Sequence, residues 1–260
     1  MSHYLKQFSV LAFIATVILI QIMPWYIGLI LASLFLTLKL NKTLTTKDIY
    51  FTSLLYIIGY CFSDFLQTIV YRWSLPDEWG VILSRLSLFG FILPFFILNY
   101  IKKPEISFLS IGSFRNTIYF PFIWRGVFKD PIWRFLIIFS SMIVVSFGFI
   151  IDFKQQDIVL LLVYALVFSI VNSILEEILW RGYILSRIVS DLGEKFGLVV
   201  TSIGFGFYHY SLGIPWILCV AFSIFGMIMG GVAIRSRGLL PVIIMHFLMN
   251  IMFVFIGMIF

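Results

Sequence analysis

Nine apolar runs dominate the sequence, and most of them are about as long as a helix that crosses a membrane. Such a helix needs about 20 apolar residues, because each residue rises 1.5 Å and the hydrocarbon core of a bilayer is about 30 Å thick. The runs lie at 6–22, 25–39, 49–71, 81–101, 132–151, 157–180, 197–211, 215–234 and 239–259. They are continuous rather than alternating, which predicts helices and argues against a transmembrane β-barrel.

The composition excludes the other broad classes of protein. Hydrophobic residues make up 62% of the 260 residues and charged residues only 12%, whereas about 25% of a typical soluble domain is charged. A globule of this size has too little interior to bury so much apolar surface. A disordered chain and a disulfide-stapled secreted fold are excluded as well. We therefore predict an all-α polytopic membrane protein, a bundle of about eight or nine transmembrane helices.

The choice between eight and nine spans depends on residues 6–39. One straight helix over this stretch would be about 50 Å long, which is too long for a single span. Pro24 suits either the start of a second helix or a kink. The stretch is therefore expected to form a short hairpin or one bent, tilted helix.

Lysine and arginine are distributed unequally between the two sides of the predicted bundle. With nine spans, 15 of the 18 basic residues fall on one side, and only Arg72, Arg85 and Lys154 fall on the other. The positive-inside rule places the 15 in the cytoplasm. The compact loops suggest a prokaryotic source, so we expect a multi-pass protein of a prokaryotic cell membrane.

The one long connection, residues 102–131, mixes aromatic and basic side chains. This pattern beside a membrane predicts a helix that lies on the cytoplasmic face of the bilayer. It divides the chain into N-terminal transmembrane helices of generic character (1–101), a cytoplasmic interfacial segment (102–131) and a transmembrane core (132–260). Its basic residues are expected to face anionic lipid headgroups rather than a nucleic acid.

Costly polar and ionisable side chains concentrate in the C-terminal helices. Such groups inside a membrane are functional candidates by default, because their burial is expensive. Glu176, Glu177 and Arg181 end the run 157–180, and His209 lies late in the next long run. The last run contains the remaining two candidates, His246 and Asn250.

Helical spacing gives these residues a predicted geometry. Residues four apart share a helix face, so Glu177 and Arg181 are expected to form an ion pair. His246 and Asn250 are also four apart and should project together. Glu176 is rotated by about 100° from Glu177 and is expected to face elsewhere.

Counting from the predicted cytoplasmic helix ends gives the expected depth of the three titratable groups. Glu176 lies about 9 Å, His246 about 11 Å and His209 about 18 Å into the membrane. Tilt can bring them to one level, which predicts a site in the cytoplasmic half of the bilayer.

Each of these residues also has a purely structural interpretation. Glu177 and Arg181 fit a structural ion pair, and His209 and Asn250 fit hydrogen bonds between helices. Glu176 has no counter-ion on its own face, so structure explains it least well. Burying all of them for packing alone would be costly, and the set therefore favours a shared function.

Three short motifs at these positions resemble one known family. EEILWR (176–181) resembles the EExxxR motif of the CPBP membrane proteases, also called the Abi or type II CAAX endopeptidase family. FGFYH (205–209) is similar to the FxxxH motif of that family, and HFLMN (246–250) to its HxxxN/D motif. The three occur in the family's order, within about residues 160–259.

This resemblance implies an intramembrane endopeptidase with a catalytic core in residues 132–260. By position, it implies that Glu176 activates the attacking water together with His209. His246 and Asn250 would stabilise the tetrahedral oxyanion, and Glu177 and Arg181 would support the site. The substrate would be a peptide or protein cut near the cytoplasmic side of the membrane. The other partners would be the lipid bilayer and other membrane proteins, with no nucleic acid.

Metal dependence stays open at this stage. Peptide hydrolysis needs a base for the water and donors for the oxyanion, and these side chains supply both without a metal. Glu176, His209 and His246 could instead bind one Zn²⁺, because two His and one Glu with water form a catalytic zinc set. The local His spacing of known zinc proteases is absent, and Asn is a poor zinc ligand, which favours the metal-free route.

Two other functions fit part of the pattern. A non-catalytic scaffold, regulator or immunity protein of the same family would not need the motif residues, all of which are present here. A transporter or proton relay also buries Glu and His, but it predicts an internal repeat that the sequence does not contain.

Overall fold

The computed structural model describes residues 3–23, 25–40, 47–102, 108–151 and 157–260. Pro24, the expected break between the first two helices, lies outside the described residues. So do Lys42, Lys103 and Lys154, which contribute to the predicted orientation.

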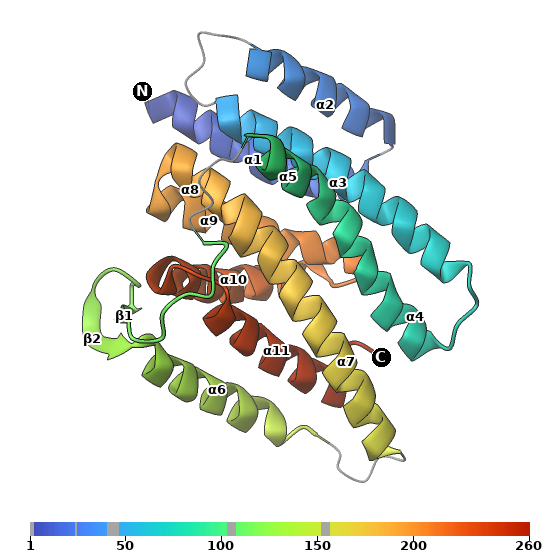
Figure 1. Ribbon diagram of the computed structural model, residues 1–260, viewed down its shortest axis with the longest axis vertical. Helices are drawn as coiled ribbons and strands as arrows, with labels where there is room; N and C mark the ends of the chain where they lie inside the picture. The colour runs from blue at the N-terminus through green and yellow to red at the C-terminus, as the bar shows by residue number, and fades with distance from the viewer. Residues whose placement is uncertain (1–2, 24, 41–46, 103–107, 152–156) are drawn as a thin grey trace.

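The described residues fold into one bundle of helices, which is the predicted all-α class (Figure 1). Nine helical stretches follow one another there, with bounds close to those of the nine apolar runs. The α-helices are α1 (His3–Ile22), α2 (Trp25–Leu40), α3 (Lys47–Tyr71), α4 (Asp77–Ser84), α5 (Leu88–Lys102), α6 (Ile132–Gly148), α7 (Ile158–Glu177), α8 (Ser186–Leu192), α9 (Glu194–Tyr208), α10 (Trp216–Ser236) and α11 (Leu240–Phe255). Three shorter segments, η1 (Arg85–Ser87), η2 (Ile178–Leu185) and η3 (His209–Leu212), continue or join these helices.

Four of the described helices are long and apolar enough to cross a membrane. They span Asp48–Tyr71, Asp77–Lys102, Ile158–Leu192 and Trp216–Ser236. Shorter apolar helices cover Phe8–Ile22, Tyr26–Leu38, Ile132–Gly148 and Leu240–Phe255. The protein is therefore an integral membrane protein by length and composition, whereas the count of eight or nine spans stays a prediction.

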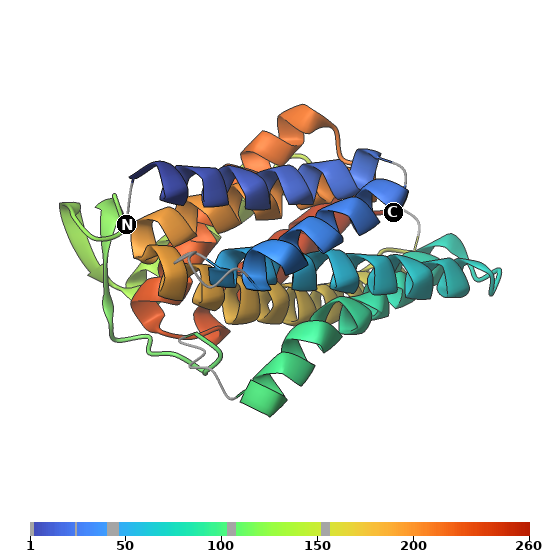
Figure 2. The same ribbon diagram turned by 90° about the horizontal axis from the view of Figure 1, so that it is seen from above.

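The two ends of the bundle differ in what they carry (Figure 2). The N-terminus lies at one end with the segment before α6, which contacts the end of α10 through a hydrogen bond from Asn116 to Arg235. We call this the basic end. The C-terminus and the turn between α3 and α4 lie at the other, the distal end. Most of the described basic residues that the sequence assigns to the cytoplasm lie at the basic end.

The expected interfacial helix in 102–131 is wrong for the described part, which forms a β-hairpin. Strands β1 (Thr117–Pro121) and β2 (Gly126–Pro131) pair antiparallel, with Thr117 opposite Pro131. The two prolines have no N–H to donate, so neither can sit inside a helix without loss. Gly126 approaches the backbone of Phe120 so closely that a Cβ there would lie 1.9 Å from its carbonyl oxygen. The cytoplasmic position of this segment stays a prediction.

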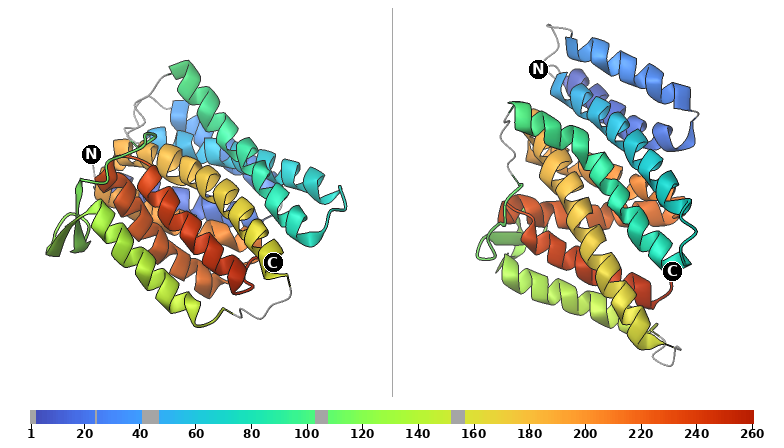
Figure 3. Two further views of the ribbon diagram at one scale, coloured as in Figure 1. Left: turned by 60° about the horizontal axis from the view of Figure 1, so that its bottom comes forward. Right: turned by 45° about the vertical axis from the view of Figure 1, so that its right-hand side comes forward.

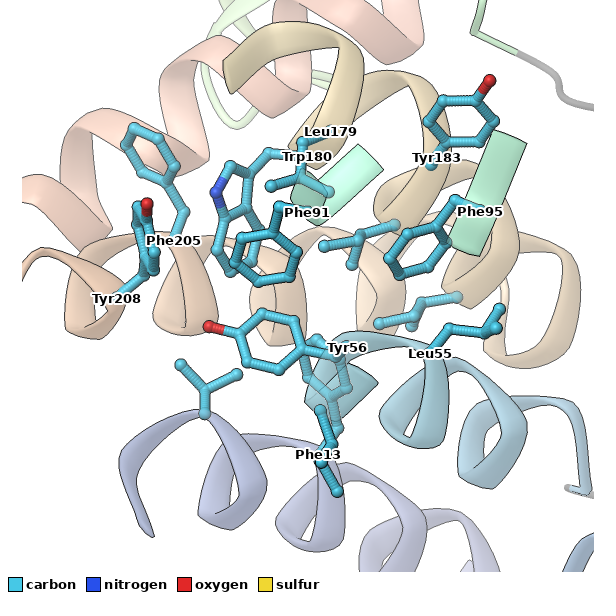
Figure 4. Close-up of a cluster of buried hydrophobic side chains, with 14 of the residues drawn as sticks. Phe13, Leu55, Tyr56, Phe91, Phe95, Leu179, Trp180, Tyr183, Phe205 and Tyr208 are labelled. Carbon is cyan, nitrogen blue, oxygen red and sulfur yellow. The ribbon is translucent and has the colours of Figure 1, made fainter. Parts of the chain in front are cut away.

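An aromatic core joins the N-terminal helices to the helix that carries the glutamate pair (Figure 4). Tyr56 of α3 packs edge-on against Phe91 of α5, with ring centroids 4.9 Å apart. Trp180 packs edge-on against Phe205 of α9 at 5.8 Å and also contacts Tyr56. Large buried rings contribute strongly to packing. The contact of Trp180 with Phe205 therefore helps to position η2 against α9.

The helices α9 and α10 pack against each other within the bundle (Figure 3), and glycines allow their close approach. A Cβ added at Gly206 would lie 2.0 Å from the Ser223 hydroxyl and 2.3 Å from the Cys219 carbonyl oxygen. At Gly226 it would lie 3.0 Å from the Phe205 ring. Glycine is therefore required at Gly206 for the observed helix spacing.

Candidate active site

The glutamate pair lies near the middle of the long helical stretch formed by α7, η2 and α8. Glu176, Glu177 and Arg181 are buried, with 1%, 0% and 3% of their surface exposed. Arg181 Nη1 donates to Glu177 Oε1 at 2.7 Å, which confirms the predicted ion pair. The helix changes to the wider π form directly after Glu177, a feature that often marks functional sites.

His246 of α11 contacts both glutamates. Its Nδ1 lies 2.7 Å from Glu177 Oε1, and its Nε2 lies 3.7 Å from Glu176 Oε2. The ion-paired Glu177 carboxylate can only accept a hydrogen bond. Nδ1 of His246 therefore carries a hydrogen and donates this hydrogen bond to Oε1. The two glutamates were expected to face in different directions from the helix. One imidazole nevertheless contacts both of them, with a different ring nitrogen toward each.

His209 approaches Glu176 from the end of α9. Its Nδ1 donates to the Phe205 carbonyl oxygen at 2.8 Å, because that oxygen can only accept. When the ring is neutral, Nε2 therefore presents a free lone pair, and this atom lies 4.0 Å from Glu176 Oε2. The Phe205 ring packs edge-on at 4.8 Å and the Phe222 ring stacks at 4.5 Å, so the imidazole is held between two aromatic rings.

One cavity of about 100 Å³ brings the predicted residues together. Glu176, His209, His246 and Asn250 all line it. Within the described residues, both carboxylate oxygens of Glu176 and the amide nitrogen of Asn250 are buried without a hydrogen-bond partner. Buried polar groups normally have partners, and a cavity of this volume has room for several waters. The wall therefore carries acceptors and a donor that are available to water and to a peptide group.

The cavity extends from Glu176 toward the distal end of the bundle. It is lined there by Leu212 and Ile214 after α9, and by Met258 and Ile259 after α11. Arg85, at the junction of α4 and α5, completes this wall. Its mouth is therefore at the end opposite the β-hairpin.

Two of the distances between the candidate zinc ligands are slightly longer than those of a tetrahedral zinc site. In a tetrahedral zinc site, ligand atoms lie about 3.4 Å from one another, as metal–ligand distances near 2.1 Å require. The two imidazole Nε2 atoms lie 3.7 and 4.0 Å from Glu176 Oε2. Across the described residues, no group of three or more His, Cys, Asp or Glu side chains is arranged to hold a metal ion.

Comparison with protein families supplies an independent finding. The family described as type II CAAX prenyl endopeptidase Rce1-like matches residues 158–252. This part of the chain is similar to the Rce1-like family. Its bounds include α7, η2, α8, α9, η3, α10 and most of α11, and therefore all six predicted site residues. This similarity to the Rce1-like family suggests intramembrane peptidase activity. Comparison with curated proteins and with solved structures gives no match.

Two residues on the cavity wall were missed by the sequence interpretation. Phe222, inside the Rce1-like region, stacks on His209, and nothing in its local sequence distinguishes it from other apolar residues. Arg85 lies outside the Rce1-like region and was assigned only to a loop. A signal existed for Arg85, because it is an ionisable residue inside an apolar run.

Proposed function

We propose that the protein is an intramembrane endopeptidase in which Glu176 and His209 activate a water that attacks a peptide bond. The observation that supports this most strongly is the convergence of Glu176, His209, His246 and Asn250 on one cavity. Glu176 Oε2, which has no hydrogen-bond partner among the described residues, lies within 4.0 Å of the Nε2 atoms of both histidines.

The gap between Glu176 and His209 suits a single water. Two acceptors 4.0 Å apart can each accept one hydrogen from a water about 2.8 Å from both, at an angle near that between its O–H bonds. As the water oxygen attacks the carbonyl carbon, its proton passes to Nε2 of His209 or to the Glu176 carboxylate. The same group then returns the proton to the departing amine, which completes general acid–base catalysis.

His246 and Asn250 are proposed to stabilise the oxyanion. The Asn250 amide has an unused donor on the cavity wall, and His246 donates from Nε2 when its ring is protonated. Glu177 accepts from Nδ1 of His246 and so orients the ring and stabilises its positive charge. The positive charge of Arg181 lies against the buried Glu177 carboxylate and compensates its negative charge.

The side of the membrane on which cleavage occurs is a separate proposal. The loop charges predicted a site in the cytoplasmic half, and this stays a prediction. The cavity opens at the distal end, which carries few basic residues. We therefore propose that substrate and water enter from the non-cytoplasmic side, contrary to the depth expected from the sequence.

Purified protein in detergent provides the direct test. Two probes are incubated with it, a farnesylated CAAX-type peptide and a matched peptide without the prenyl group, and products are identified by mass spectrometry. Glu176→Gln is expected to lower kcat at least about 10³-fold, whereas Glu78→Gln, in α4 outside the cavity, retains wild-type activity. Equal cleavage by Glu176→Gln and the wild type, with matching thermal unfolding, would refute the assignment.

The metal-free route is likewise a proposal with its own test. Protein dialysed against a zinc chelator is expected to keep full activity and to contain no stoichiometric zinc by elemental analysis. Activity that falls with the metal content and returns on adding zinc would overturn it.

A further inference from the structure

The wall of the catalytic cavity carries an amide side chain that the proposed mechanism does not use. Asn172 of α7 lines the cavity together with Glu176, which follows it by four residues on the same helix face. Only 4% of the surface of Asn172 is exposed. Its amide oxygen is buried without a hydrogen-bond partner among the residues that the structure describes. Because a buried acceptor without a partner is costly, this position favours a donor that comes from outside the chain.

A second unpaired amide atom lies on another wall of the same cavity. The side-chain nitrogen of Asn250 on α11 is also buried without a partner in the described part of the chain. The Asn172 oxygen and the Asn250 nitrogen therefore do not bond to each other, although they share one cavity. The cavity thus offers one neutral acceptor and one neutral donor. A peptide backbone presents the complementary groups, an N–H and a C=O at every residue other than proline.

Apolar side chains form much of the remaining wall. Phe168 lies one turn before Asn172 on α7 and lines the cavity, as do Met249 and Phe253 of α11. Aromatic rings and the flexible thioether of methionine pack well against apolar side chains, but they do not accept strong hydrogen bonds from a backbone N–H. A backbone N–H that is buried in this cavity needs an acceptor, and the Asn172 oxygen is available to supply one.

The geometry of α7 sets the distance between Asn172 and the bond that is cut. Four residues along a helix correspond to about 6 Å. Asn172 lies on the distal side of Glu176, because α7 begins near the C-terminus of the chain (Figure 3). An extended peptide covers about 3.3–3.6 Å per residue. A backbone group held at Asn172 is therefore about two residues away from a bond held at Glu176.

We propose that Asn172 accepts a hydrogen bond from a backbone N–H of the substrate, about two residues from the bond that is cut, and so aligns the peptide with Glu176. The contact recognises the backbone, so it applies to peptides of different sequence. This inference rests on the proposed peptidase function and adds a substrate-binding residue to it.

Peptides that lack one backbone N–H provide the test. The parent is the farnesylated CAAX-type peptide or its unprenylated counterpart, whichever the purified wild type cleaves faster in detergent. In each analogue, one N–H within three residues of the cut bond is replaced by an ester oxygen, which removes a donor with little change in shape. The bond that is cut stays an amide in every analogue.

The wild type is expected to be sensitive to the ester at one position. The analogue modified about two residues from the cut bond should lose about 5- to 50-fold in kcat/KM, because its ester leaves a buried acceptor without a partner. The loss should appear mainly in KM, since the hydrogen bond is present both in the bound substrate and in the transition state.

Variants of Asn172 and Ser169 separate backbone recognition from a structural role. Asn172→Leu keeps a similar shape without an acceptor, so it is expected to cleave the parent and the sensitive analogue at equal rates. Ser169→Ala is the matched control, because the Ser169 hydroxyl of α7 is also buried without a partner among the described residues but lies outside the cavity lining. This control should retain the full effect of the ester. If Asn172→Leu does not fold, Asn172→Ala takes its place.

The outcomes distinguish this inference from the proposed function. An ester effect that disappears in Asn172→Leu and persists in Ser169→Ala supports the contact. Equal cleavage of the parent and all analogues by the wild type overturns the role of Asn172 and leaves the peptidase intact. An ester effect that persists in the Asn172 variant also overturns it, even if that variant is less active overall, since Asn172 then acts on structure or binds only water. Failure of the wild type to cleave either parent refutes the peptidase and this inference together.

Discussion

The buried pair of Glu177 and Arg181 provides a quantitative test of how the site is held together. Both side chains are at most 3% exposed, and their charged atoms are 2.7 Å apart. Arg181→Met removes the charge and the hydrogen bonds but keeps a long apolar side chain. Glu177→Gln removes the negative charge with little change in shape.

The structure sets the expected size of the effect. Removing one partner of a buried ion pair typically costs about 3–5 kcal/mol, because the other charge is left uncompensated. In Arg181→Met, Glu177 keeps the hydrogen bond from His246 at 2.7 Å, which places the cost near the lower limit. The contact of the guanidinium with the Phe205 ring at 4.1 Å is lost as well. This loss adds about 1–2 kcal/mol to the cost. For a chain of this length, a total of about 4–5 kcal/mol corresponds to a fall in Tm of roughly 8–20 °C.

Thermal unfolding in detergent, followed by the fluorescence of the seven tryptophans, measures each variant. The double variant Glu177→Gln/Arg181→Met is expected to recover much of the stability, with a coupling free energy of at least about 2 kcal/mol. It should remain poorly active, because Nδ1 of His246 no longer faces a carboxylate. Additive losses in the two single variants, or a fall in Tm below about 2 °C in Arg181→Met, would refute the reasoning.

Three further predictions follow from the site and its surroundings. Asn250→Ala is expected to lower kcat by about 10²–10³-fold with little change in KM, as for other oxyanion donors; steady-state kinetics on a cleaved peptide decide, and a change in KM alone would contradict the role. Gly206→Ala should destabilise the fold by about 1–3 kcal/mol, because its Cβ would overlap Ser223; the control is Gly148→Ala, where nothing lies within 4 Å, and equal Tm values would contradict the packing argument. In a Cys61→Ser background, Ser211→Cys, an exposed position next to Leu212 of the cavity wall, should react with a membrane-impermeant maleimide added outside cells. Ser110→Cys at the basic end should react only after permeabilisation. The reverse labelling pattern would show that the cavity opens to the cytoplasm.

Much of the site was predictable because its motifs are local. Glu177 and Arg181 are one turn apart, so their ion pair follows from helical spacing alone. The contact of His209 with Phe205 follows from the same spacing. His246 and Asn250 share a helix face for this reason and line the same cavity.

Other features could not be read from spacing. Helical geometry separated Glu176 from Glu177, but it could not show that His246 of another helix would contact both. The local sequence carries no clear signal for the π-helix after Glu177. The segment before α6 was predicted to be helical from its aromatic and basic residues, yet two prolines and a close backbone contact at Gly126 favour strands.

The sequence by itself determined the class of the protein, the helices that carry the polar residues and the faces on which neighbours one turn apart must lie. These follow from apolar length and helical periodicity, which act within one helix. Only the tertiary structure decided that Glu176 stands between two histidines, that the cavity opens at the distal end and that Arg85 joins its wall. Such features depend on how separate helices pack, and the distances between helices are set by side chains far apart in the chain.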